Sequence, residues 1–215
     1  LGELEAGADL VVIGFDSVDP TGYGRLLFDD KSRLAGLREE KDATSAERAL
    51  TFCNSGIMAF RSGKTVSGLI ARVGNDSAKG EYYLTDAVGL AYQDGLQTRV
   101  VLSHGDEVLG VNSRSELAVA EALMQRRLRD TAMEHGASLA APETVFFSYD
   151  TVIGRDVYIE PNVIFEPGVT VEDGVTIKGF CHFEQARIGA NVTIGPFARL
   201  RPGADLAPGA HVGND

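Results

Sequence analysis

The feature that most limits how this chain can fold is a six-residue repeat in its last third. Large aliphatic or aromatic residues recur at every sixth position, and a single five-residue step interrupts the series. The series is Ile153, Ile159, Phe165, Val171, Ile177, Phe183, and then Ile188, Ile194, Leu200, Leu206, Val212. A small or β-branched residue follows most of them by four positions, which is typical of a hexapeptide-repeat β-helix with three six-residue faces per coil. A β-sandwich is the alternative, but period-2 alternation does not place a small residue at i+4 so regularly.

The first 112 residues carry a different, mixed α/β pattern. Short apolar runs predict strands at 11–15, 57–60 and 98–103, and a hairpin of 26–28 with 34–37. Asn54-Ser55-Gly56 is expected to precede the strand at 57–60. One helix is predicted at 85–94, with Gly95 as its cap. A second is predicted from four apolar residues that share one helical face, and Gly74 ends it. The residues of that face are Val66, Leu69, Ile70 and Val73.

One long helix is predicted between these two regions, over residues 113–135. Ser113 and Glu116 have the spacing of a capping box, and Gly136 ends the helix. Its expected apolar stripe consists of Leu117, Ala120, Met124, Leu128 and either Thr131 or Ala132. A narrow stripe on a long helix suits a linker between two bodies.

Charge and cysteine content exclude several functional classes. The formal net charge is −11, so nonspecific binding to nucleic acid or to an anionic membrane is not expected. No apolar run reaches the length of a membrane span. The two cysteines, Cys53 and Cys181, fit neither a disulfide framework nor a metal motif, and we expect free thiols in a reducing cytoplasm.

Five short motifs occur in a fixed order ahead of the long helix. They are Gly22-Tyr23-Gly24-Arg25, Glu39-Glu40-Lys41-Asp42-Ala43-Thr44, Asn54-Ser55-Gly56, Gly80-Glu81-Tyr82-Tyr83-Leu84-Thr85-Asp86 and Gly110-Val111-Asn112-Ser113-Arg114. Each is weak or moderate alone. Followed by a long helix and hexapeptide repeats, they closely resemble the bacterial bifunctional N-acetylglucosamine-1-phosphate uridyltransferase/glucosamine-1-phosphate acetyltransferase family. The resemblance runs from about residue 10 to residue 214.

The resemblance implies a fold in three parts. Residues 1–114 would be the C-terminal half of an α/β Rossmann-like nucleotidyltransferase (uridyltransferase) domain, residues 115–136 a linker α-helix, and residues 137–215 the first coils of a left-handed parallel β-helix. The family makes UDP-N-acetylglucosamine for cell-wall and lipopolysaccharide synthesis. It transfers an acetyl group from acetyl-CoA to glucosamine 1-phosphate, then joins the product to UTP with Mg²⁺ and releases pyrophosphate. By the same analogy the protein would be a cytoplasmic homotrimer.

Three residues match the family's uridyltransferase sugar site. Gly24 lies in a Gly-rich turn, where a backbone can approach a ligand closely, although a plain hairpin-entry turn has the same sequence. Glu39 can accept hydrogen bonds from sugar hydroxyls; Glu40 is the competing candidate, but the register to Lys41-Asp42 favours Glu39. Asn54 offers a donor and an acceptor to an N-acetyl group, or it makes an Asx turn before a strand.

Three further residues match with less local support. Glu81 is placed at the sugar site, or is a carboxylate at a helix entry. Asn112 matches the asparagine that holds Mg²⁺ together with an aspartate from earlier in the family's domain, or it caps backbone beside Ser113. Arg201 matches the arginine that grips the sugar phosphate in the acetyltransferase site, whereas an exposed turn arginine is the ordinary interpretation.

Some family residues have no match here. The Gly-rich nucleotide-binding loop and the partner aspartate would lie ahead of Leu1, and the basic histidine and the CoA-binding coils would follow Asp215. No catalytic residue is therefore expected within these residues, and we expect both sites to be incomplete. Two other interpretations are open: a single-function sugar-nucleotide pyrophosphorylase, which acetyl-CoA-dependent acetylation would exclude, and a noncatalytic β-helix assembly subunit, which bound UDP-sugar or magnesium would exclude.

Overall fold

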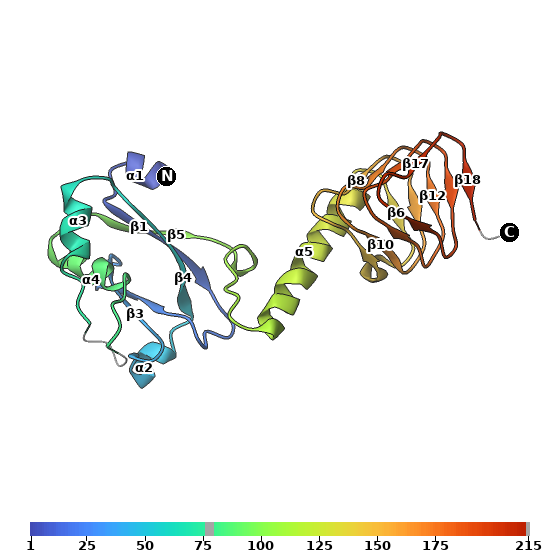
Figure 1. Ribbon diagram of the computed structural model, residues 1–215. Coiled ribbons are helices and arrows are strands. Elements are labelled where there is room, and N and C mark those ends of the chain that lie inside the picture. Colours follow the sequence, from blue (N-terminus) through green and yellow to red (C-terminus); the bar gives the residue numbers. More distant parts are fainter. Residues whose placement is uncertain (76–79, 214–215) are drawn as a thin grey trace. The chain divides into compact units, whose positions relative to one another are not determined.

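The protein is described by a computed structural model that covers residues 1–75 and 80–213. Contacts divide it into two compact units, Leu1–Gly110 and Val111–Asp215 (Figure 1). Of the helices in the described ranges, none combines the length and apolar character that crossing a bilayer requires. The long helix belongs by its contacts to the second unit.

The first unit is built on a mixed five-stranded sheet. The strands lie in the order β3 (Leu34–Arg38), β2 (Arg25–Phe28), β4 (Phe52–Phe60), β1 (Leu10–Asp16) and β5 (Thr98–Leu102). Only β1 and β5 pair in parallel, and the other pairs are antiparallel. The described part of the unit also contains four short helices, α1 (Gly2–Glu5), α2 (Ser45–Arg48), α3 (Lys64–Ile70) and α4 (Asp86–Gln93), and a 3-10 turn at Gly105–Glu107. The hairpin, the strand at 98–102 and the helix at 86–93 confirm the predictions.

The core of the first unit lies between the sheet and the helices α3 and α4. Leu10, Val12 and Leu26 from the strands pack with Leu69 of α3 and Val88 of α4, and all five are buried. Gly95 has a φ of +73°, and the Leu96 N–H donates to the Ala91 carbonyl, so the end of α4 is the predicted glycine cap.

Two local predictions in this unit are wrong. The helix α3 ends at Ile70, and Ile70 is exposed. The residues that follow form turns with i to i−3 hydrogen bonds, such as Arg72 N–H to the Leu69 carbonyl at 3.0 Å, and do not continue the α-helix. Val73 therefore does not extend the predicted face. Asn54-Ser55-Gly56 does not precede a strand but lies inside β4. The pairing of β1 with β4 shifts register at this point, and Gly56 has a φ of +83°, so the segment forms a β-bulge.

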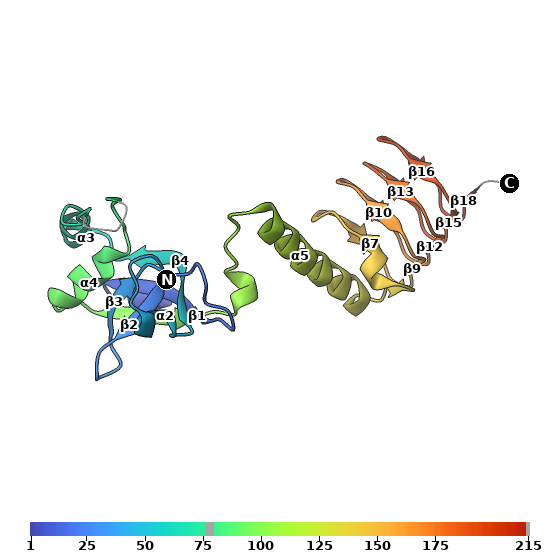
Figure 2. The ribbon, with the colours of Figure 1, turned by 90° about the horizontal axis from the view of Figure 1, so that it is seen from below.

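The second unit is the predicted left-handed parallel β-helix. Its thirteen described short strands pair in parallel and form three stacked faces, β16-β13-β10-β7, β17-β14-β11-β8 and β18-β15-β12-β9-β6, and Figure 2 labels strands of the first and third. The strands are β6 (Ser138–Leu139), β7 (Val145–Phe146), β8 (Val152–Ile153), β9 (Tyr158–Ile159), β10 (Val163–Phe165), β11 (Thr170–Val171), β12 (Thr176–Ile177), β13 (His182–Phe183), β14 (Arg187–Ile188), β15 (Thr193–Ile194), β16 (Arg199–Leu200), β17 (Asp205–Leu206) and β18 (His211–Val212). No β-sandwich is present in the described residues.

The repeat residues form the core of the β-helix as predicted. Ile159, Ile177 and Ile194 are fully buried in one column. Phe147, Phe165 and Phe183 form another, with ring centroids 5.0 and 5.4 Å apart. The corners turn through left-handed backbone, and three of them use Phe180, Gln185 and Phe197 rather than glycine, asparagine or aspartate. Sequence rules for turns do not predict these three.

The helix α5 (Arg114–Glu134) begins at the predicted capping box, and its C-terminal half covers the first coil. Gln125 is buried and exchanges two hydrogen bonds with the backbone of Phe147, at 2.7 and 2.9 Å. Those bonds satisfy backbone groups at the open end of the β-helix. The predicted stripe is wrong in its N-terminal half, because Leu117 and Met124 are exposed and only the later turns reach the coils.

Candidate functional site

Three of the predicted sugar-site segments meet in the first unit, where β2, β3 and β4 lie side by side. The Asn54 N–H donates to the Gly24 carbonyl at 2.8 Å. A methyl group on Gly24 would lie 3.4 Å from the Glu39 carboxylate. Strand pairing therefore brings together Gly24, Glu39 and Asn54, which are up to thirty positions apart in the sequence.

Gly24 is itself buried, and the space over its Cα is narrow. An added Cβ would meet Leu37 Cδ2 at 2.9 Å as well as the carboxylate of Glu39. Glycine is needed at this position because the end of β3 approaches the backbone so closely. The structure thus supports close approach, rather than only a hairpin-entry turn, as the reason for glycine.

The two candidate glutamates have different partners. Glu40 lies 2.8 Å from the guanidinium of the buried Arg25. Glu39 accepts a 3.0 Å hydrogen bond from the Thr85 hydroxyl and lines a cavity of about 380 Å³. Glu40 is held in an internal ion pair, whereas the Glu39 carboxylate lines a cavity. The partners of the two carboxylates agree with the sequence register, which already favoured Glu39 over Glu40.

The cavity beside Glu39 is bounded by the turn after β3 and by α4. Its other polar lining residues are Arg38, Asp42, Arg72, Tyr83, Asp86 and Gln93. Arg72 is paired with Asp94 at 2.6 Å, and this contact raises the pKa of the guanidinium. The floor is supplied by Leu37, Gly89 and Leu90. A cavity with an apolar floor and several hydroxyl, amide and carboxylate groups can hold a sugar.

Asn54 is buried and its side chain is oriented by the bulge in β4. Its Oδ1 accepts the Gly56 N–H at 3.1 Å, so an Asx-type turn is present, although within a strand rather than before one. The NH₂ end of the amide can then donate to a carbonyl oxygen such as that of an N-acetyl group. Both interpretations of Asn54 are compatible in this geometry.

The three remaining predicted residues are all exposed. Glu81 is exposed, four positions ahead of Thr85. Asn112 is exposed in the second unit, and its backbone N–H donates to Glu116, which also accepts the Ser113 N–H. Arg201 is exposed in the turn after β16, where its carbonyl accepts the Ala204 N–H. Their predicted roles remain predictions.

No group of three or more His, Cys, Asp or Glu side chains in the described residues is arranged to hold a metal ion. The exposed amide of Asn112 is a hard oxygen donor of the type Mg²⁺ accepts. The Asn112 amide could supply one oxygen ligand to a magnesium ion whose other ligands come from other residues or from the substrate.

Sequence reasoning missed two residues that the structure connects to the cluster. Thr85 holds the Glu39 carboxylate, and Arg25 holds that of Glu40. Both lie within motifs that were identified, directly beside Asp86 and Gly24. The available signal was an arginine at the start of an otherwise apolar strand, which requires buried partners.

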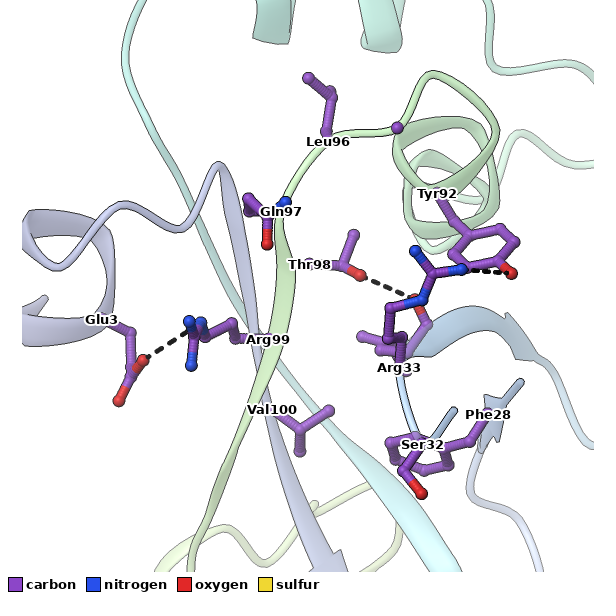
Figure 3. Close-up of a pocket in the computed structure, with 12 residues that line it drawn as sticks. Glu3, Phe28, Ser32, Arg33, Tyr92, Leu96, Gln97, Thr98, Arg99 and Val100 are labelled. Atoms are coloured by element: carbon purple, nitrogen blue, oxygen red, sulfur yellow. Dashed lines mark hydrogen bonds and ion pairs between the residues drawn. The ribbon is translucent and has the colours of Figure 1, made fainter. Parts of the chain in front are cut away.

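A second cavity, of about 440 Å³, lies elsewhere in the first unit, between α4 and β5 (Figure 3). The guanidinium of Arg33 lies 5.1 Å from the ring centroid of Tyr92 and is paired with Asp29 at 2.8 Å. The figure also shows Arg99 directed toward Glu3, 3.7 Å away. None of the predicted site residues lines this cavity, so the larger cavity is not the predicted sugar site.

Comparison with known proteins gives consistent matches. Residues 150–185 match the family model described as bacterial transferase hexapeptide (six repeats). The chain is 60% identical over 184 residues to the bifunctional protein GlmU of Rhodospirillum rubrum, covering 86% of this chain and 41% of that protein. The corresponding values for GlmU of Xanthobacter autotrophicus are 56% over 198 residues, covering 92% and 44%.

GlmU of Agrobacterium fabrum is 51% identical over 211 residues, covering 98% of this chain and 46% of that protein. The chain thus spans about half the length of the curated relatives it matches. The resemblance predicted from the sequence is confirmed: over nearly all of its residues this chain is related to a segment of the bifunctional GlmU family.

Proposed function

We propose that this chain belongs to an enzyme that makes UDP-N-acetylglucosamine in two steps. In the first step, the acetyl group of acetyl-CoA passes to the amine of glucosamine 1-phosphate and free CoA leaves. In the second, a phosphate oxygen of N-acetylglucosamine 1-phosphate attacks the α-phosphorus of UTP, and pyrophosphate leaves. The second step needs no protein nucleophile, so catalysis rests on positioning and charge stabilisation.

The observation that carries this proposal is the meeting of Gly24, Glu39 and Asn54, of which Glu39 lines a cavity. In the proposed role the Glu39 carboxylate accepts hydrogen bonds from sugar hydroxyls, and the Asn54 NH₂ group donates to the N-acetyl carbonyl. Gly24 leaves room for the carboxylate, since an added Cβ would lie 3.4 Å from it. Glu81 is assigned to the rim of the same site on the resemblance alone.

Asn112 and Arg201 are assigned to phosphate chemistry on the resemblance. The Asn112 amide oxygen would hold Mg²⁺, which when bound neutralises charge on the substrate phosphates. The Arg201 guanidinium would bind the phosphate of glucosamine 1-phosphate through two parallel hydrogen bonds. Its position in an exposed turn of the β-helix leaves the guanidinium accessible to such a ligand.

We also propose that the protein is a homotrimer and works in the cytoplasm. Each of the three faces of the β-helix carries an exposed apolar side chain, which favours association with other subunits: Phe146 and Ile164 on one face, Val152 on the second and Tyr158 on the third, each more than 40% exposed. UTP and acetyl-CoA are metabolites of the cytoplasm, and both cysteines are free and buried. Sedimentation of a monomer at micromolar concentration would contradict the trimer.

Calorimetric titration of the chain with N-acetylglucosamine 1-phosphate and with UDP-N-acetylglucosamine tests the sugar site. We expect binding of both, weaker binding of glucose 1-phosphate because it lacks the N-acetyl group, and a loss of about tenfold or more on Glu39→Gln. Asp30→Asn, in the turn between β2 and β3, is the matched control. Equal binding by both variants, or no preference for the N-acetyl sugar, would refute the assignment and favour a noncatalytic role.

A further inference from the structure

A buried arginine lies at the centre of the segments that form the candidate sugar site. Arg25 is 1% exposed, although it carries a full charge. Its guanidinium donates to the carbonyls of Tyr23, Leu50 and Arg48, the last two at 2.9 and 3.1 Å. Its fourth partner is the Glu40 carboxylate, at 2.8 Å. A buried charge is tolerated only when it is paired and hydrogen-bonded in this way.

Each partner of Arg25 lies next to a residue of the candidate site or leads to one. Tyr23 precedes Gly24, and Glu40 follows Glu39. Arg48 and Leu50 belong to the segment that enters β4, where Arg25 itself pairs with Cys53, the neighbour of Asn54. One side chain therefore connects the three chain segments that bring the site residues together.

The chemistry of guanidinium explains why arginine stands here. Its planar fork presents five N–H donors in fixed directions, whereas the ammonium group of lysine is a single point with three. Four acceptors spread over three segments can be reached by a guanidinium group but not by the ammonium group of lysine. The contact with Glu40 Oε2 is close but not aligned as a hydrogen bond, so its attraction is mainly electrostatic.

We propose that Arg25 and Glu40 are a positioning pair that fixes Gly24, Glu39 and Asn54 for recognition of the sugar phosphate. Neither residue touches the ligand; both act through the backbone segments they join. The inference rests on the proposed function for its ligand, but the ordering of the three segments can be measured without any ligand.

Hydrogen–deuterium exchange of the free chain tests the positioning directly. Arg25→Lys keeps the charge but loses the fork, and Glu40→Gln keeps the size but loses the charge. We expect both to increase exchange in the peptides covering 22–26, 38–42 and 50–56. Arg61→Lys is the matched control, because Arg61 also donates to two carbonyls, Leu4 and Ala8, and pairs with Asp9 at 3.5 Å.

Calorimetry with N-acetylglucosamine 1-phosphate then separates positioning from simple loss of folded protein. A residue that only stabilises the fold would reduce the number of binding sites at constant affinity. If the pair positions the site residues, its loss weakens the affinity itself. We expect Arg25→Lys to bind about tenfold or more weakly, with an unchanged number of binding sites per chain. Arg61→Lys should bind like the unmodified chain.

The outcomes distinguish the two proposals. Unchanged exchange in the three peptides, or unchanged affinity in both variants, overturns the positioning role while leaving the sugar site intact. Failure of the unmodified chain to bind the sugar phosphate overturns the proposed function and with it this inference. Increased exchange confined to the three peptides, together with weaker binding, supports both.

Discussion

Replacing Gly24 by alanine isolates the requirement for close approach at the candidate site. The new Cβ would lie 2.9 Å from Leu37 Cδ2 and 3.4 Å from the Glu39 carboxylate. The methyl of Leu37 has to move by about 0.5 Å or more to restore ordinary contact. Because that methyl ends a flexible side chain, we expect a loss of only about 1 kcal/mol in the free energy of unfolding.

The effect on ligand binding should be larger than the effect on stability. A methyl group in contact with the carboxylate would occupy space beside the acceptor proposed to bind the sugar hydroxyls. Losing one hydrogen bond to a charged group costs about 1.5–3 kcal/mol, which corresponds to roughly ten- to a hundredfold in the dissociation constant. Calorimetry with N-acetylglucosamine 1-phosphate and denaturant unfolding measure the two quantities separately.

Gly36→Ala is the control for this substitution. Gly36 lies in β3 of the same sheet, and an added Cβ there meets nothing within 4 Å. It should bind as the unmodified chain does. If Gly24→Ala also binds normally, or if Gly36→Ala weakens binding equally, the close approach at Gly24 has no role in recognition and the reasoning fails.

Three further predictions concern stability. Phe165 lies in the middle of the buried phenylalanine column, and Phe165→Ala should lower the free energy of unfolding by about 4 kcal/mol in denaturant titration. Phe180 is 58% exposed, and Phe180→Ala should lower it by less than about 1 kcal/mol. Similar losses in the two variants would contradict the assigned core. Ser113→Ala removes the cap of α5 and should ease local opening at 114–118 by about 1 kcal/mol, measured by hydrogen exchange, with Ser115→Ala unchanged. The backbone N–H of Arg33 donates to Asp29 and holds the pKa of that carboxyl well below its usual range, so the ionised carboxylate stabilises the fold above about pH 4 and this stabilisation is lost as the pH falls. Asp29→Asn should reduce the stability at pH 7 and flatten the acid limb of a plot of stability against pH. An unchanged acid limb would refute the assignment.

Much of the fold was predictable because its signals are local or periodic. The six-residue spacing placed Ile159, Phe165 and Ile177 in the core correctly, since each coil repeats the same inward position. The capping box at Ser113 and the glycine cap at Gly95 follow from hydrogen bonds within a few residues. Features of this kind need no knowledge of the tertiary structure.

The errors arose where tertiary partners decide the outcome. Leu117 and Met124 have helical spacing but no coil to pack on, so periodicity alone misassigned them. The bulge at Gly56 depends on how β4 pairs with β1, which is invisible in the sequence of β4.

The candidate site was predictable only in part. Motifs and the family resemblance identified Gly24, Glu39 and Asn54 and favoured Glu39 over Glu40, but only the structure shows the different partners of the two carboxylates. Thr85 and Arg25 were missed because a hydroxyl or guanidinium gains its role from residues distant in the sequence.

A crystal structure of this chain with UDP-N-acetylglucosamine tests the central claim most directly. The account predicts that the sugar lies beside Gly24, with its hydroxyls on the Glu39 carboxylate and its N-acetyl carbonyl on the Asn54 amide. A sugar bound instead in the cavity of Arg33 and Tyr92, or one that leaves Glu39 and Asn54 without contact, would contradict it.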